Sequence, residues 1–211
     1  MENIKRYLKF SENWDPNDPK HLVLALIESG DHVLDVGCSY GSFAKRLVQK
    51  GCVVDGVENY PPAIEVAKSI HNEIYEIDLN NYSELSKITK KYDVISFLDV
   101  LEHCIDPSEV ILELKKNLTP KGKIYISVPN IVNLIDRISI LRGRFEYEEY
   151  GVMDKTHVRF FTRKTAIQLV ADHFGSVRCI GYSPRHPLLK PFLRFRPTLF
   201  AMQFIIEGKN H

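Results

Sequence analysis

The chain has 211 residues, of which 44% are hydrophobic, and a formal net charge of +1. This length and composition are ordinary for one soluble globular domain and exclude an extended disordered chain. The near-zero net charge argues against a general nucleic-acid binder, which usually carries a clear basic excess. We therefore expect a small-molecule partner and no nucleic acid.

The cysteines are widely scattered and form no C-x-x-C pair: Cys38, Cys52, Cys104 and Cys179. This spacing indicates neither a disulfide framework nor a zinc site, so reduced thiols and no metal are expected. No apolar run approaches the ~20 residues of a membrane span, and the N-terminus lacks the apolar core of a secretion signal. We expect a cytoplasmic protein, whose oligomeric state the sequence does not indicate.

The sequence pattern predicts alternating strands and helices after a first helix over 20–29. Strands are expected near 31–37, 52–58, 73–77, 92–98 and 122–129. Helices are expected between them, over 41–50, 61–71, 82–90 and 107–117. A helix over 163–174 and strands over 176–182 and 199–207 complete the chain. Such alternation is typical of a parallel sheet with helices on both faces.

The first strand breaks at Gly37, and a helix opens at Gly41. Glycines at this turn let the backbone approach a nucleotide closely. However, Ser39 and Ser42 occupy the second and third glycine positions of the dinucleotide motif, so a pyrophosphate fits poorly. This disfavours a nicotinamide oxidoreductase.

Acidic residues stand at the ends of four predicted strands: Asp35, Glu58, Asp78 and Asp99. Ligands of parallel sheets bind beyond the carboxyl ends of the strands, so these carboxylates are expected around one crevice. They would repel a phosphate and attract a cation. S-adenosylmethionine fits, because it carries a sulfonium and an ammonium and no phosphate. Glu58 lies 21 residues after Gly37, the spacing of a carboxylate that accepts hydrogen bonds from ribose hydroxyls.

Five elements keep the order and spacing of a known family: residues 33–38, Glu58, Asp78, 92–103, and 118–123 before a strand over 124–128. They resemble the class I S-adenosylmethionine-dependent methyltransferases, in particular the small-molecule enzymes of ubiquinone and menaquinone biosynthesis. The resemblance covers about residues 20–182. One departure is Ser39, where the family usually has glycine.

The resemblance implies an α/β, Rossmann-like fold in which a single domain over 1–211 contains a seven-stranded, mostly parallel sheet with an antiparallel last strand. S-adenosyl-L-methionine is the implied cofactor. The residues expected to bind it are Asp35, Gly37, Cys38, Ser39, Tyr40, Gly41, Glu58, Asp78, Leu79 and Asp99.

Residues 131–161 interrupt the alternation, and we interpret this segment, called the lid, as covering the methyl acceptor. Asp154 and His157 are three residues apart, and a carboxylate that orients an imidazole is the arrangement of a general base. His103, in the turn after the fourth parallel strand, is the third candidate catalytic residue. Alternatively, Asp154, His157 and Arg159 hold the lid in place by hydrogen bonds, and His103 only lines the pocket.

Two further segments invite a functional interpretation. Residues 1–30 form a candidate N-terminal cap, in which Tyr7, Phe10 and Trp14 could face a sulfonium, or a terminal helix that packs on the sheet. The connection 183–198 interleaves basic side chains with Leu and Phe. This composition suits the acceptor mouth or contact with a membrane surface or a lipid-linked substrate, whereas packing under the sheet edge is the alternative.

The lid also resembles a subgroup pattern, here Asp154, His157 and Phe161-Thr162. Its members include many that are predicted to act on hydroxyls of saccharides, lipids or secondary metabolites. We therefore predict methyl transfer to a small-molecule hydroxyl, which needs alignment and no metal. The alternative is a non-catalytic cofactor-binding partner or regulatory subunit of a metabolic enzyme. The lid resembles, more distantly, a methyltransferase-like protein that works with homoserine acetyltransferase in methionine synthesis.

Overall fold

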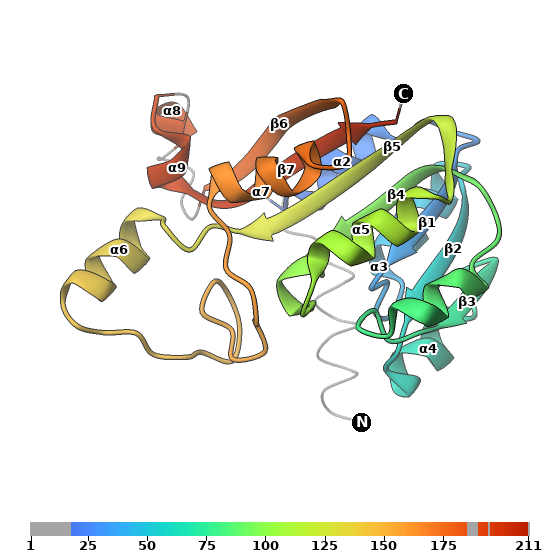
Figure 1. The fold of residues 1–211 in the computed structure, drawn as a ribbon, viewed down its shortest axis with the longest axis horizontal. Helices are drawn as coiled ribbons and strands as arrows, with labels where there is room; N and C mark the ends of the chain where they lie inside the picture. Colours follow the sequence, from blue (N-terminus) through green and yellow to red (C-terminus); the bar gives the residue numbers. More distant parts are fainter. Residues whose placement is uncertain (1–17, 185–189, 194, 211) are drawn as a thin grey trace.

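A seven-stranded sheet with the strand order β3-β2-β1-β4-β5-β7-β6 forms the centre of the protein in a computed structural model, which describes residues 18–184, 190–193 and 195–210 (Figure 1). The strands are β1 (His32–Val36), β2 (Val53–Glu58), β3 (Glu73–Glu76), β4 (Tyr92–Leu98), β5 (Leu118–Pro129), β6 (Ser176–Pro184) and β7 (Ala201–Lys209). Strand β7 is antiparallel to its neighbours β5 and β6, whereas the pairs among β1 to β5 are parallel. The predicted α/β fold with an antiparallel last strand is confirmed.

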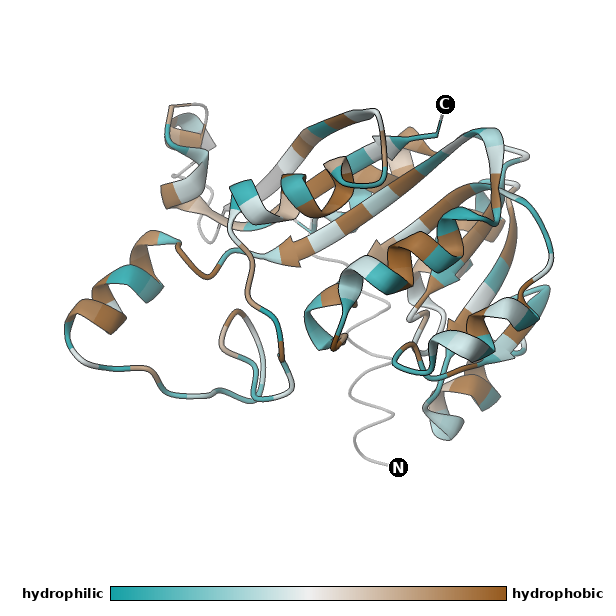
Figure 2. Cartoon of the chain, viewed as in Figure 1, coloured by the Kyte–Doolittle hydropathy of each residue, from teal (hydrophilic) through white to brown (hydrophobic). Residues whose placement is uncertain are grey.

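Helices cover both faces of this sheet. The helices of the described residues are α2 (Lys20–Leu26), α3 (Ser42–Gln49), α4 (Pro61–Ala67), α5 (Pro107–Lys115), α6 (Leu134–Leu141), α7 (Arg163–Ala171), α8 (Lys190–Leu193) and α9 (Pro197–Phe200), with 3₁₀ turns η1 (Tyr82–Lys87) and η2 (Leu101–His103). One apolar cluster joins the sheet to η1, α5 and α7, and a second joins its other face to α2 and α3. Apolar residues are visible along the strands, α5 and α7 in Figure 2. The sheet is therefore buried on both faces.

Local hydrogen bonds set where the helices begin. The Asp106 carboxylate accepts from the N–H groups of Ser108 and Glu109, with Pro107 as the first residue of α5. Thr162 and Thr165 form a reciprocal capping box at the start of α7. These caps fix the entry of two helices that lie beside the candidate site.

Three of the differences from the sequence prediction concern the type or the start of an element. The helix expected over 82–90 is the 3₁₀ turn η1, in which the Ser86 hydroxyl donates to the Ser83 carbonyl at 2.7 Å and competes with helical bonding. Strand β5 begins at Leu118 rather than near residue 122. The last strand begins at Ala201 rather than 199, because the preceding residues form the short helix α9.

The lid, residues 131–161, contains the helix α6, which the sequence analysis did not predict. The Asn133 side chain caps it by accepting from the N–H groups of Ile135 and Asp136. None of its residues is buried, and the helix projects away from the sheet (Figure 1). This helix therefore forms without burying a side chain in the core.

Two predicted segments fall partly or wholly outside the described residues. Tyr7, Phe10 and Trp14 of the N-terminal cap lie in 1–17, and Arg185, His186 and Arg194 of the connection 183–198 are also outside. Their interpretations as a cofactor cap and as a lipid-facing or acceptor-facing surface stay predictions. Among the described helices, none has the length and apolar character needed to cross a bilayer.

Candidate active site

A cavity lies at the carboxyl ends of β1, β2 and β4, the edge where the sequence predicts the ligand. Six predicted site residues line it: Gly37, Glu58, Asp78, Leu79, Asp99 and His103. The rest of the lining is Val57, Asn59, Ile77, Asn80, Val100 and Cys104. The fold thus brings together side chains that are spread over about a third of the chain.

The turn between β1 and α3 places three residues in the left-handed region. Gly37 has a φ of 68°, Ser39 of 49° and Gly41 of 79°. A Cβ at Gly37 would lie 2.5 Å from Val100 Cγ2, so glycine is required there for space as well as conformation. Ser39 takes the conformation that glycine usually supplies, at a cost of roughly 1 to 2 kcal/mol. The departure from the family pattern therefore preserves the shape of the loop.

The Glu58 carboxylate connects this loop to the end of β2. Its Oε2 accepts from the Ser39 N–H at 2.9 Å, and its Oε1 accepts from the N–H groups of Asn59 at 2.9 Å and Tyr60 at 3.0 Å. Three backbone N–H groups therefore orient the carboxylate. A carboxylate has about four acceptor positions, so the fixed group retains capacity for a ligand hydroxyl.

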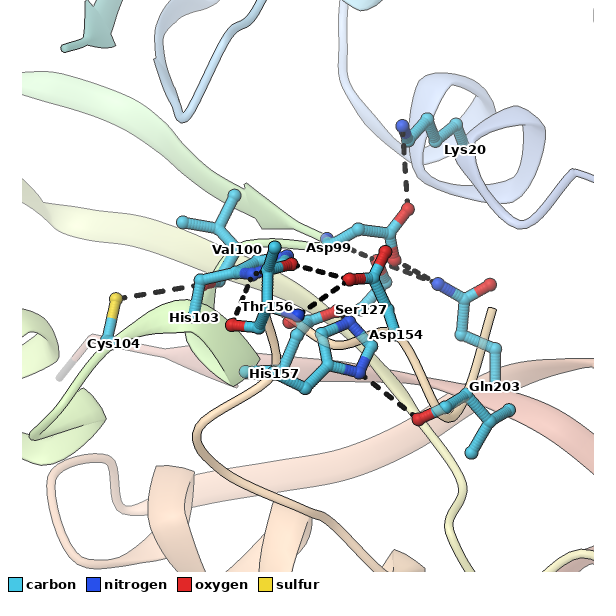
Figure 3. Close-up of polar contacts among 12 residues, drawn as sticks. Lys20, Asp99, Val100, His103, Cys104, Ser127, Asp154, Thr156, His157 and Gln203 are labelled. Atoms are coloured by element: carbon cyan, nitrogen blue, oxygen red, sulfur yellow. Dashed lines mark hydrogen bonds and ion pairs between the residues drawn. The ribbon is translucent and has the colours of Figure 1, made fainter. Parts of the chain in front are cut away.

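Two further carboxylates are held at the rim. Asp78 Oδ1 accepts from the Asn80 N–H at 3.0 Å, and the Asn80 amide oxygen accepts from the Ile105 N–H at 2.8 Å. The second carboxylate is Asp99, which has a φ of 61° and contacts side chains from three other elements (Figure 3): Ser127 Oγ at 2.6 Å, Lys20 Nζ at 3.5 Å and the Gln203 amide. The cavity therefore keeps acidic groups in fixed positions.

Asp35 does not line this cavity, although the sequence analysis expects it to face the ligand. Its side chain is buried beneath the glycine turn and accepts a hydrogen bond of 2.9 Å from Ser96 Oγ. Burial raises the pKa of Asp35 above its ordinary value, and the nearby His71 opposes this. Cys38 and Tyr40 are also buried in the turn. Cofactor binding by these three residues stays a prediction.

The two candidate histidines meet where the lid reaches the turn η2. The rings of His103 and His157 are edge to face, with centroids 4.8 Å apart (Figure 3). His103 Nδ1 lies 3.2 Å from the Thr156 carbonyl oxygen and 3.1 Å from Thr156 Oγ1. His157 Nδ1 lies 3.1 Å from the Val152 carbonyl oxygen. Both rings are therefore positioned by lid atoms.

Asp154 does not orient the His157 ring, so the predicted carboxylate–imidazole pair requires correction. Asp154 Oδ1 accepts from the Thr156 N–H at 2.8 Å and from Thr156 Oγ1 at 2.7 Å. Asp side chains in turns commonly bond to the backbone two residues on, and here that preference prevails. The carboxylate that faces His157 is Glu102, with Oε1 at 4.0 Å from Nε2.

Glu102 is a buried acid that the sequence analysis did not single out. Its side chain is 2% exposed, and its Oε2 has no hydrogen-bond partner among the described residues. Burial raises the pKa of Glu102 well above its ordinary value, and Asp99 adds to the effect. Burial also lowers the pKa of His157. Both shifts favour the neutral form of the group.

Thr156 is the other site residue that the sequence analysis missed, and nothing in the sequence pattern marks it.

Three side chains of metal-ligand type also meet at this site. One possible ligand atom from each of Glu102, His103 and His157 lies within 4.8 Å of the others, a cluster that the spacing of these residues in the sequence could not reveal. Lid carbonyl oxygens already contact Nδ1 of both histidines. Metal-free chemistry stays a prediction.

Comparisons with known proteins identify the family. A family described as a methyltransferase domain matches residues 8–175, and the chain belongs to that family. The resemblance to the class I S-adenosylmethionine-dependent methyltransferases is confirmed.

Two similar curated proteins carry the name ubiquinone biosynthesis O-methyltransferase. The protein of Coxiella burnetii is 30% identical over 146 residues, which are 61% of this chain and 62% of the relative. The protein of Haemophilus ducreyi is 30% identical over 138 residues, 56% of this chain and 58% of the relative. The match thus spans somewhat less than two thirds of these relatives.

Solved structures share the fold at low sequence identity. A SAM-dependent methyltransferase from Archaeoglobus fulgidus has a TM-score of 0.68 at 18% identity, covering 90% of this chain and 94% of that one. Magnesium protoporphyrin IX methyltransferase from Synechocystis PCC 6803 with bound SAH has a TM-score of 0.69 at 15% identity, covering 100% and 95%. Both support the Rossmann-like assignment.

Proposed function

We propose that the protein transfers a methyl group from S-adenosylmethionine to a hydroxyl of a small molecule, in the class of saccharides, lipids or secondary metabolites. The observation that carries the proposal is the cavity at the strand ends, where fixed carboxylates and His103 share one lining. Membership of the methyltransferase domain family supports the reaction class. The name O-methyltransferase of two relatives supports an oxygen acceptor.

The carboxylates suit this cofactor by charge. Glu58 accepts hydrogen bonds from the ribose hydroxyls, because its carboxylate is already oriented at the cavity rim. Asp99 and Asp78 supply negative charge in the same cavity, which attracts the cationic methionyl part. A structural neighbour, the Synechocystis enzyme, is described with bound SAH.

The reaction is an in-line displacement at the methyl carbon. The acceptor oxygen forms a bond to that carbon while the carbon–sulfur bond breaks, and its electron pair remains on sulfur as S-adenosylhomocysteine forms. A neutral hydroxyl must lose its proton during or before the attack, and His103 is the cavity-lining base for that proton. Alignment of the acceptor and the cofactor within the cavity supplies much of the remaining acceleration.

Two measurements test the proposal. Calorimetry should show binding of S-adenosylmethionine and S-adenosylhomocysteine and no binding of NAD. Incubation of the protein with methyl-labelled cofactor and a metabolite extract should then yield a labelled ether that base treatment does not cleave. Binding without any labelled product, together with co-purification of an acyltransferase, would instead support a regulatory subunit.

A further inference from the structure

We propose that Thr156, supported by Asp154, is a positioning residue that holds His103 in the tautomer able to accept the acceptor's proton. This inference rests on the proposed function, because it assigns a role within the same site. Asp154 then acts on His103 through Thr156, rather than on His157 three residues further along the chain.

Hydrogen-bond donors and acceptors determine the tautomer. Thr156 Oγ1 donates its single proton to Asp154 Oδ1 at 2.7 Å, the shortest contact of this hydroxyl. The hydroxyl can then only accept from His103 Nδ1 at 3.1 Å, and the Thr156 carbonyl oxygen at 3.2 Å can never donate. Nδ1 therefore carries the proton, and Nε2 of neutral His103 is left as a base.

His157 is the rival base, and its surroundings favour another role. Its Nδ1 contacts the Val152 carbonyl, and its Nε2 faces Glu102 Oε1 at 4.0 Å. Its side chain is only 6% exposed and is not part of the cavity lining, whereas His103 lines the cavity. The His157 ring packs edge to face against His103 and limits how that ring can turn.

The lid backbone keeps Thr156 in register with His103. The N–H groups of Val158 and Arg159 donate to the Glu102 carbonyl at 2.9 and 3.0 Å, one residue before His103. The Arg159 Nε donates to the Ile105 carbonyl at 2.8 Å. These bonds attach the lid on both sides of His103, so Thr156 reaches Nδ1 from a fixed position.

The arrangement accounts for the proton in the reaction. The acceptor hydroxyl gives its proton to His103 Nε2 as its oxygen attacks the methyl carbon, and the sulfur takes the electron pair of the breaking bond. The resulting imidazolium donates from Nδ1 to Thr156, and the negative Asp154 carboxylate stabilises its charge through the threonine hydroxyl. After product release, Nε2 returns the proton to water.

Histidine-selective nitrogen NMR of the whole protein tests the tautomer directly. A His103→Gln variant identifies the signals of His103. The wild type should show a protonated Nδ1 and an unprotonated Nε2. In Thr156→Val only the backbone carbonyl acceptor remains, so the fraction of the other tautomer of His103 should rise. Thr156→Ser, which retains the hydroxyl, should keep the wild-type pattern. An unchanged His103 spectrum in Thr156→Val would overturn the proposal.

Turnover supplies the second readout, with the acceptor found in the labelling screen. Thr156→Val should lower kcat by about 10-fold or more, within the range of general-base effects. KM for the cofactor should change little, and Thr156→Ser should recover most of the rate. The matched control is Thr119→Val, which removes a hydroxyl that donates to Asp93 at 3.3 Å away from the cavity lining.

The two proposals can fail separately. Loss of the Nδ1–H tautomer in Thr156→Val without a fall in kcat would reject the positioning role and leave methyl transfer standing. Absence of S-adenosylmethionine binding in wild-type calorimetry would reject the proposed function, whatever the histidine spectrum shows. An equal fall in kcat for Thr119→Val would show that general destabilisation, rather than the site, lowers turnover.

Discussion

Glu58 holds the backbone of Ser39: its Oε2 accepts from the Ser39 N–H at 2.9 Å, across 19 residues of chain. Ser39 is also the position where this chain departs from glycine and keeps a left-handed φ of 49°. The hydrogen bond stabilises a backbone conformation that serine alone disfavours. One carboxylate therefore shapes the glycine turn and faces the cavity.

Glu58→Ala should weaken S-adenosylmethionine binding by about 1 to 3 kcal/mol, because the ribose hydroxyls and the Ser39 N–H lose their acceptor. Isothermal calorimetry measures the change. Glu65→Ala removes an exposed carboxylate of α4 that pairs with Lys68, and it should leave the affinity unchanged. Equal affinity in wild type and Glu58→Ala would remove Glu58 from the cofactor site.

Gly37→Ala should lower the free energy of unfolding by about 2 kcal/mol or more, since the new methyl group would lie 2.5 Å from Val100 Cγ2 in a left-handed backbone. Gly143→Ala is the matched control, because Gly143 has a φ of 74° and nothing within 4 Å of the added Cβ. Urea unfolding of both variants separates the clash from the conformational cost. Similar losses in the two variants would contradict a steric role for Val100.

The alternation of strands and helices is a local signal, and it predicted the parallel sheet well. The acids at the strand ends, Glu58, Asp78 and Asp99, predicted the cavity, because ligands of parallel sheets bind beyond the carboxyl ends of the strands. The hydrogen-bond partners within the lid were harder to predict from the sequence. Asp154 and His157 suggested a pair by spacing, but a turn directs the Asp154 carboxylate to Thr156. The partner that a carboxylate bonds to depends on competing hydrogen bonds, and the spacing of residues in the sequence does not determine it.

His157→Ala should lower turnover more than it lowers cofactor affinity. The His157 ring packs on His103 and contacts Val152 in the lid, and it does not line the cavity with Glu58. Steady-state kinetics and calorimetry on the same preparation compare the two effects. Equal losses in rate and affinity would assign His157 to structural support.

Methyl transfer should continue after dialysis against a chelator, since displacement at a sulfonium needs alignment and proton removal rather than a Lewis acid. The assay is labelled methyl transfer before and after treatment, with and without added magnesium. A loss that magnesium restores would contradict this prediction. Glu102, His103 and His157 would then be the first residues to substitute, because their ligand-type atoms lie within 4.8 Å.

Glu102→Gln should change how stability depends on pH. Burial raises the pKa of Glu102 in the folded protein above its ordinary value of 4.5, so the unfolded chain loses this proton first as pH rises. The contribution of neutral Glu102 to the free energy of unfolding is therefore fully present below pH 4.5. It falls as the pH rises towards the pKa of Glu102 in the folded protein. The slope for one such group is about 1.4 kcal/mol per pH unit.

Urea unfolding at a series of pH values from about 5 to about 7 measures this slope. The free energy of unfolding of wild type, minus that of Glu102→Gln, should fall steadily across the series, because glutamine keeps the shape and does not titrate. His157 has a lowered pKa and acts in the opposite sense, losing stability as pH drops below 6.5, but both proteins contain it. Glu113→Gln, which replaces a half-buried carboxylate of α5 that pairs with Lys116, is the control substitution. A constant difference between wild type and Glu102→Gln would mean that the buried carboxyl ionises normally. The interpretation that a neutral Glu102 faces His157 would then be wrong.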